Sequence, residues 1–172
     1  GKLLRDLDLF DSLQKMIQNG LPVFGTCAGL ILLAERLSND ANTYFGTLPG
    51  TVQRNAYGRQ LGSFYAELPF RGITGSATDN SKNLAMNRSA DLATVPMTFI
   101  RAPVIQSVGE GVEVLAKVPS EIYLPQIVES SQKPEGDIVA VRYKNQLGIT
   151  FHPELNEDLR IHKYFVEMCR VR

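Results

Sequence analysis

The chain has 172 residues, a length typical of one domain, with 44% hydrophobic and 21% charged residues. Its 18 basic and 18 acidic residues leave a formal net charge of zero, which argues against nucleic acid or an anionic membrane surface as a partner. No apolar run is long enough to predict a membrane-spanning helix. Two cysteines are no disulfide scaffold, so we expect a reducing, cytoplasmic setting.

The first part of the chain predicts a helix, a strand, a tight turn and a second helix. Apolar residues recur at spacings of three and four over residues 2–18, and Asn19-Gly20 ends this helix. Residues 21–24 predict a buried strand, and residues 30–37 an apolar helix. The segment between them reads Gly25-Thr26-Cys27-Ala28-Gly29.

The rest of the chain predicts mostly strands, one polar loop and a closing helix. Sheet and turns are expected over residues 43–70, a surface insertion over 71–91, strands over 97–100, 112–118, 138–143 and 147–151, and a helix over 157–168. This pattern indicates an α/β sheet with helices on its faces, built as a single domain over residues 1–172.

Cys27 stands on the predicted strand-to-helix turn, where a cysteine has a chemical advantage. The turn projects the sulfur outward, the following helix N-terminus stabilises a thiolate, and the backbone N–H of Ala28 becomes a candidate oxyanion donor. The alternative interpretation is a small buried hydrophobic residue, which is common for a free cysteine. The turn alone favours neither interpretation.

His152-Pro153-Glu154 follows another predicted strand. Pro153 favours an extended backbone at His152, which would place Glu154 on the same side as the imidazole. Glu154 could then orient His152, which would accept the thiol proton and return it to a leaving amine. The alternative is a surface histidine beside an unrelated carboxylate.

The second cysteine and the second histidine provide internal comparisons. His162 lies in the predicted last helix and Cys169 directly at its end, both away from any glycine turn, and we interpret them as structural or solvated. The four residues show no ligand-like spacing, so no metal site is expected.

Two sets of motifs resemble a known family. Phe24-Gly25-Thr26-Cys27-Ala28-Gly29-Leu30 together with Phe151-His152-Pro153-Glu154 resembles the class I, triad-type glutamine amidotransferases. Residues 52–60, which read Val-Gln-Arg-Asn-Ala-Tyr-Gly-Arg-Gln, and residues 99–105, which read Phe-Ile-Arg-Ala-Pro-Val-Ile, narrow the resemblance to the glutaminase subunits of pyridoxal 5′-phosphate synthase. The resemblance covers nearly the whole chain except residues 71–91.

The resemblance implies a role for each matching residue. Cys27 would be the nucleophile, with His152 and Glu154 completing a catalytic triad, and Arg54, Ile100 and Arg101 would bind glutamine. A guanidinium suits the carboxylate of a free amino acid, although a surface ion pair is the ordinary role of such an arginine. The implied fold is the flavodoxin-like three-layer sandwich, with a mostly parallel sheet and helices on both faces.

Members of this family begin with a strand, a helix, another strand and a Gly-Gly-Glu-Ser loop, which this sequence does not contain before Gly1. We therefore expect that the N-terminal part of the domain is missing from the sequence, and with it one oxyanion donor.

The function that the resemblance implies is hydrolysis of L-glutamine to glutamate and ammonia through a Cys27 thioester, without a cofactor. The ammonia would pass to a barrel-type synthase subunit that makes pyridoxal 5′-phosphate, vitamin B6, in a heteromeric complex. Two alternatives remain open: a non-catalytic or regulatory subunit of the same complex, and a class I amidotransferase with another acceptor.

Overall fold

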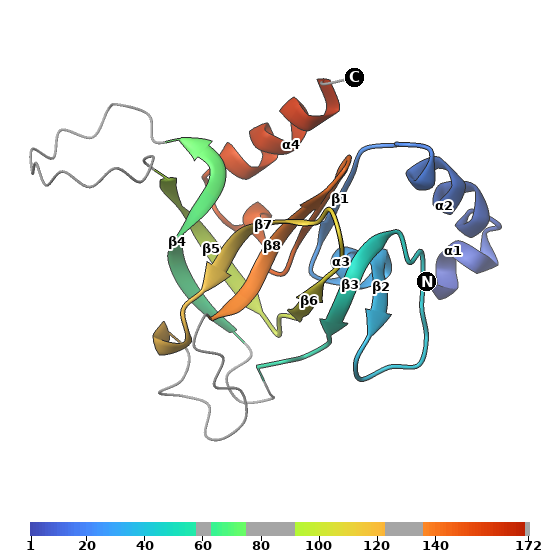
Figure 1. The fold of residues 1–172 in the computed structure, drawn as a ribbon, viewed down its shortest axis with the longest axis horizontal. Helices are drawn as coiled ribbons and strands as arrows, with labels where there is room; N and C mark the ends of the chain where they lie inside the picture. Colours follow the sequence, from blue (N-terminus) through green and yellow to red (C-terminus); the bar gives the residue numbers. More distant parts are fainter. Residues whose placement is uncertain (58–62, 75–91, 123–135, 171–172) are drawn as a thin grey trace, which may run out of the picture.

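A computed structural model describes residues 1–57, 63–74, 92–122 and 136–170 (Figure 1). The helices are α1 (Lys2–Asp6), α2 (Phe10–Gln18), α3 (Ala28–Leu33) and α4 (Arg160–Arg170), with short 3₁₀ helices η1 (Ser120–Ile122) and η3 (Pro153–Leu155). The strands are β1 (Val23–Thr26), β2 (Ala34–Leu37), β3 (Leu48–Gln53), β4 (Ser63–Thr74), β5 (Leu92–Ile100), β6 (Val104–Val108), β7 (Glu113–Val118), β8 (Asp137–Tyr143) and β9 (Gln146–Ile149).

The described strands form one large sheet and one two-stranded ribbon. Seven strands run in the order β1-β9-β8-β6-β3-β2, with β7 also paired to β8, while β4 and β5 form the antiparallel ribbon. Only the pairs β1–β9 and β2–β3 are parallel, so the predicted α/β class is confirmed but the sheet is mixed rather than mostly parallel. Short connections are the reason, because a turn as tight as the one between β8 and β9 can join only antiparallel strands.

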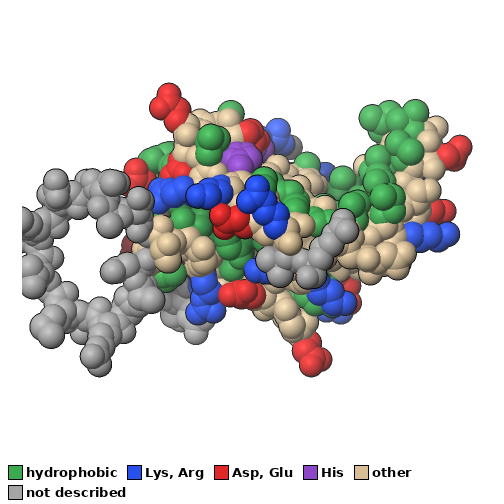
Figure 2. All heavy atoms as spheres, turned by 90° about the horizontal axis from the view of Figure 1, so that it is seen from above, with side chains coloured by type: hydrophobic (Ala, Val, Ile, Leu, Met, Phe, Trp, Pro, Cys, Tyr) green, Lys and Arg blue, Asp and Glu red, His purple; other side chains and the backbone are tan. Residues whose placement is uncertain are grey.

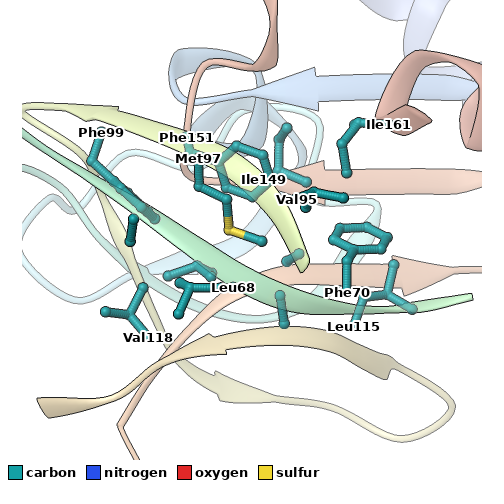
Figure 3. Close-up of a cluster of buried hydrophobic side chains, with 14 of the residues drawn as sticks. Leu68, Phe70, Val95, Met97, Phe99, Leu115, Val118, Ile149, Phe151 and Ile161 are labelled. Carbon is teal, nitrogen blue, oxygen red and sulfur yellow. The ribbon is translucent and has the colours of Figure 1, made fainter. Parts of the chain in front are cut away.

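The large sheet is covered on both faces, as a three-layer fold requires. On one face, Val23 and Val141 pack in a hydrophobic cluster with Leu30 and Leu33 of α3. On the other face, a second cluster joins the sheet to the β4–β5 ribbon and α4 (Figure 3). Its fully buried members include Phe70, Val95, Met97, Phe99, Ile149 and Phe151.

Two predicted helices differ from the structure. The helix predicted over residues 2–18 is divided into α1 and α2, because Asp8 adopts a φ of 54° that an α-helix cannot accommodate. The helix predicted over residues 30–37 ends at Leu33, and Ala34 turns to an extended ψ of 135° at the start of β2. The predicted strand over residues 21–24 corresponds to β1, two residues later in the chain.

The polar segment predicted as a surface insertion is described only at its beginning. Residues 71–74 form the end of β4 rather than a loop. Residues 75–91 lie outside the described residues.

α1 and α2 carry exposed apolar side chains at one end of the molecule (Figure 2). Leu3 and Leu7 of this segment are 68% and 57% exposed, and Met16 is 50% exposed. None of the helices in the described part of the chain is long and apolar enough to cross a membrane.

Candidate functional site

Cys27 occupies the single residue between β1 and α3, in a backbone conformation that residues with a side chain rarely adopt. Its φ is 46° and its ψ is −100°. Such a conformation persists only where the surroundings enforce it, and it is typical of residues with a chemical role. The Cys27 N–H donates to the Ile149 carbonyl at 2.9 Å, so the turn is tied to the end of β9.

Gly25 explains how this tight turn packs. A Cβ atom at this position would lie 2.8 Å from the carbonyl carbon of Gly29, 2.8 Å from Leu33 Cδ1 and 2.9 Å from the backbone nitrogen of Leu30. Two of these three atoms belong to the backbone of α3 and cannot move without moving the helix. Only glycine therefore lets α3 approach β1 this closely.

Replacing Gly25 with alanine should lower the free energy of unfolding by about 1–3 kcal/mol, the usual cost of overpacking. Gly29 offers a matched control, because nothing lies within 4 Å of a Cβ atom there and alanine is the better helix former. Urea unfolding of both variants measures the difference. Equal stability of the two variants would contradict the packing argument.

His152 and Glu154 lie just beyond β9, and their side chains meet. The Nδ1 atom of His152 is 2.7 Å from Oε1 of Glu154, and the two side chains are 21% and 50% exposed. The predicted contact is thus present, but its backbone differs from the prediction. Pro153 begins η3, so a 3₁₀ turn rather than an extended segment brings the two side chains together.

The surroundings of Glu154 favour the ionised form of its carboxylate. Burial by itself would raise the pKa of Glu154, but the hydrogen bond with His152, a backbone N–H and the nearby charges of His152 and His162 together hold that pKa below its usual value. An ionised Glu154 favours the imidazole tautomer that carries the proton on Nδ1 and leaves Nε2 free to accept one.

The turn of Cys27 and the His152 loop share one end of the sheet. β1 and β9 are adjacent and parallel, with Thr26 paired to Ile149, so both residues follow the carboxyl ends of neighbouring strands. The charge of Glu154 is close enough to raise the pKa of the Cys27 thiol. The two segments that the sequence separates by more than a hundred residues are therefore neighbours, in the position where α/β folds bind ligands.

The Cys27 thiol resists ionisation in this structure. Burial raises its pKa, a hydrogen bond from the Ala28 N–H lowers it, and Glu154 raises it again, with a net upward shift. The Ala28 N–H therefore does point at the sulfur, although α3 behind it has only six residues.

This shift predicts how fast Cys27 reacts with iodoacetamide. Because the thiolate is the reactive form and its pKa is raised, the rate for the free protein should be low at pH 7 and should still be rising above pH 9. Alkylation should be followed in a Cys169→Ser background, since Cys169 is exposed. Glu154→Gln should move the profile to lower pH, and a midpoint near pH 7 in the parent would contradict the prediction.

Arg54 is held in place by Asp40 and Asn39. Its Nη1 atom lies 2.6 Å from Oδ2 of Asp40, and Asn39 bonds both its backbone N–H and its carbonyl. Hydrogen bonds from Asn42 and the ion pair with Arg54 keep the pKa of Asp40 below its ordinary value. The Arg54 side chain nevertheless stays 42% exposed.

Ile100 and Arg101 lie at the end of β5, beside the Arg54 turn. Ile100 is 40% exposed, and Arg101 has a φ of 46°. The Ala56 N–H donates to the Ala102 carbonyl at 3.2 Å, which joins the two turns. β5 also reaches the other half of the site, because the His152 N–H donates to the Thr98 carbonyl at 2.8 Å.

His162 lies partly buried on α4, against β1. Its ring packs edge-on to Phe24, with centroids 6.0 Å apart, and its Nδ1 atom is buried without a hydrogen-bond partner among the described residues. Its charge also acts on Glu154. The ring contact with Phe24 fits the structural interpretation, although the residue as a whole is only partly buried.

Comparison with known proteins places these features in a family. The SNO glutamine amidotransferase family matches residues 1–171. A Desulfitobacterium hafniense protein named pyridoxal 5′-phosphate synthase subunit PdxT is 55% identical over 97% of this chain, which spans 66% of that relative. A Streptococcus pneumoniae protein of the same name is 44% identical over 99% of this chain and 70% of its own length.

Solved structures agree with this result. A crystal structure of a glutamine amidotransferase superposes with a TM-score of 0.74 and 35% sequence identity, covering 99% of this chain and 72% of that one. The chain therefore belongs to the SNO glutamine amidotransferase family.

Proposed function

We propose that this protein is the glutaminase subunit of a pyridoxal 5′-phosphate synthase. The observation that carries the proposal is the placement of the strained Cys27 turn and the His152–Glu154 pair at the carboxyl ends of two paired parallel strands. Membership in the amidotransferase family and the names of its relatives support glutamine as the nitrogen source and vitamin B6 as the product of the complex.

The reaction would proceed through a thioester. His152 takes the proton of the Cys27 thiol, and the sulfur attacks the amide carbon of glutamine. The Ala28 N–H stabilises the resulting oxyanion. His152 then gives the proton to the leaving nitrogen, which departs as ammonia, and the thioester is hydrolysed by a water molecule that His152 activates. Glu154 orients the imidazole and stabilises its charged form, and none of these steps calls for a metal or a cofactor.

Arg54, Ile100 and Arg101 are proposed to bind the amino-acid end of glutamine. The Arg54 side chain stays partly exposed while Nη1 contacts Asp40, and a guanidinium has further N–H donors, so it could receive the substrate carboxylate without being freed from Asp40. The exposed end of β5 would supply backbone groups at Ile100 and Arg101. Thr98, two residues earlier, bonds the backbone of His152, and a substrate held there would lie close to the triad.

The proposed partner is a barrel-type synthase subunit that consumes the ammonia. The relatives are named as subunits, which supports a heteromeric complex. Two unpaired cysteines fit a reducing compartment, and we propose the cytoplasm.

Glutamate release from glutamine, measured with and without the synthase subunit, tests the proposal. We expect release to increase on addition of the synthase, and ¹⁵N from the glutamine amide to appear in pyridoxal 5′-phosphate. A glutamine-analogue electrophile should label Cys27 and leave Cys169 unmodified. Binding to the synthase without labelling and without glutamate release would instead establish a non-catalytic subunit.

A further inference from the structure

The segment from His152 to Arg160 runs along one edge of β5. Three alternate carbonyl groups of β5 accept hydrogen bonds from it: Thr98 from the His152 N–H, Pro96 from the Asn156 side chain, and Thr94 from the Arg160 guanidinium. The opposite edge of β5 pairs with β4. The segment therefore covers an edge that β4 leaves open.

Pro96 lies on the edge of β5 that the segment from His152 to Arg160 covers. A proline has no N–H to donate and is tolerated in a strand only where no ladder bond is required of it. Here its carbonyl accepts from Asn156 at 3.4 Å, on the same edge as the carbonyl groups of Thr94 and Thr98. One backbone N–H and two side chains, rather than a further strand, supply the donors.

Asn156 contributes the side chain of this segment that contacts the backbone of His152, whose carbonyl also accepts from the Leu155 N–H at 3.3 Å. Its Nδ2 atom donates to the Pro96 carbonyl and to the His152 carbonyl, both at 3.4 Å. Its Oδ1 atom accepts from the Thr98 hydroxyl at 3.1 Å. The Asn156 amide thus links the His152 backbone to Thr98 and Pro96 of β5. The bond from the His152 N–H to the Thr98 carbonyl is a second link between the same two segments.

We propose that Asn156 is a positioning residue, which together with Thr98 fixes the place of the His152 imidazole relative to Cys27. The inference rests on the proposed glutaminase function and adds to it a residue outside the triad. Asn156 makes no contact with Glu154 in the hydrogen bonds of the described residues, so it acts on the His152 backbone rather than on the ring.

The chemistry requires an amide at this position. The side chain donates to two carbonyl groups and accepts from one hydroxyl. A side-chain amide has two N–H donors and an acceptor oxygen, whereas a hydroxyl has a single O–H to donate. Aspartate could still accept from Thr98 but would face the carbonyl groups of Pro96 and His152 with a negative charge. Alanine would remove all three side-chain bonds and leave the bond from the His152 N–H to the Thr98 carbonyl as the remaining link between this part of the loop and β5 among the bonds described above.

Activity of Asn156→Ala in the presence of the synthase subunit provides the first part of the test. We expect kcat to fall by about 100-fold, because a shift of about 1 Å in a reacting group has an effect of this size, while KM for glutamine changes little. Thr98→Val should lower kcat in the same direction, and Thr98→Ser should restore it because the hydroxyl is kept. Arg160→Ala is the matched control: it removes a bond to the same edge, far from His152, and should leave kcat unchanged.

The ring signals of the two histidines provide the second part, which does not depend on activity. In NMR spectra, assigned with His162→Gln, the His152 signals should move in Asn156→Ala and stay in place in Arg160→Ala. Unmoved His152 signals, or an equal loss of kcat in Arg160→Ala, would overturn the proposal. If the parent protein releases no glutamate but the His152 signals move as expected, the positioning role stands and the glutaminase function fails.

Discussion

Replacing Cys27 with alanine should reduce glutamate release in the presence of the synthase subunit to background, a loss on the order of a millionfold. The nucleophile has no substitute in the described site: Cys169 lies on α4 and is separated from the turn that presents Cys27. Without the sulfur no thioester forms, and glutamine is left to the oxyanion donor and the binding residues alone. A coupled assay for glutamate measures the loss.

Two controls separate chemistry from folding in this experiment. Cys169→Ala should retain the parent rate, and Cys27→Ala should keep the parent unfolding transition, since alanine is no larger than cysteine and the turn is enforced by Gly25 and by the bond to Ile149. Cys27→Ser keeps a hydroxyl nucleophile but should also be close to inactive, because an alcohol ionises far less readily than a thiol. Undiminished release in Cys27→Ala would refute the assignment of the nucleophile.

Local patterns were enough to predict the parts of the site that lie close together in the sequence. The glycines around Cys27 predict a strand-to-helix turn, and the spacing of His152 and Glu154 predicts their contact. Both features depend on a few adjacent residues, although the contact of His152 with Glu154 is made through a 3₁₀ turn at Pro153 rather than through the expected extended backbone. Because ligands gather at the carboxyl ends of strands in α/β folds, the positions of Cys27 and His152 after predicted strands indicate that the two residues share one site.

Features that depend on long-range pairing could not be predicted in this way. Ala34-Glu35-Arg36-Leu37 consists of good helix formers, yet its pairing with β3 turns it into β2, so tertiary contacts override the local preference. β6 was missed because a five-residue strand after Pro103 has no distinct pattern. The mixed direction of the sheet likewise follows from its connections rather than from residue types.

The same limit applies to the residues around the triad. Arg54 was predicted from the resemblance alone, and its ion pair with Asp40 joins residues fourteen positions apart on two different turns. Asn156 and Thr98 carry no signal in the sequence, because an asparagine after a short turn is ordinary. Their hydrogen bonds depend on how the segment from His152 to Arg160 lies along β5, which the sequence does not show.

Replacing His152 with alanine should lower glutamate release by about 100- to 10,000-fold, the usual contribution of a general acid and base. The loss arises twice in the proposed reaction, when the thiol gives up its proton and when the leaving nitrogen receives one. The effect should be larger than in a typical thiol enzyme, because burial and Glu154 raise the pKa of Cys27 and leave little thiolate without a base. Glutamate release with the synthase present again measures it.

His162 is the matched control within the same chain, since it also lies near Glu154 but packs against Phe24. His162→Ala should retain most of the activity, and an equal loss in the two variants would contradict the assignment of the base. The double variant Cys27→Ala/His152→Ala should be no less active than Cys27→Ala alone, because a base has nothing to activate once the thiol is gone. That non-additivity is the strictest expectation of a triad: it requires Cys27 and His152 to act on the same proton, which two independently useful residues would not do.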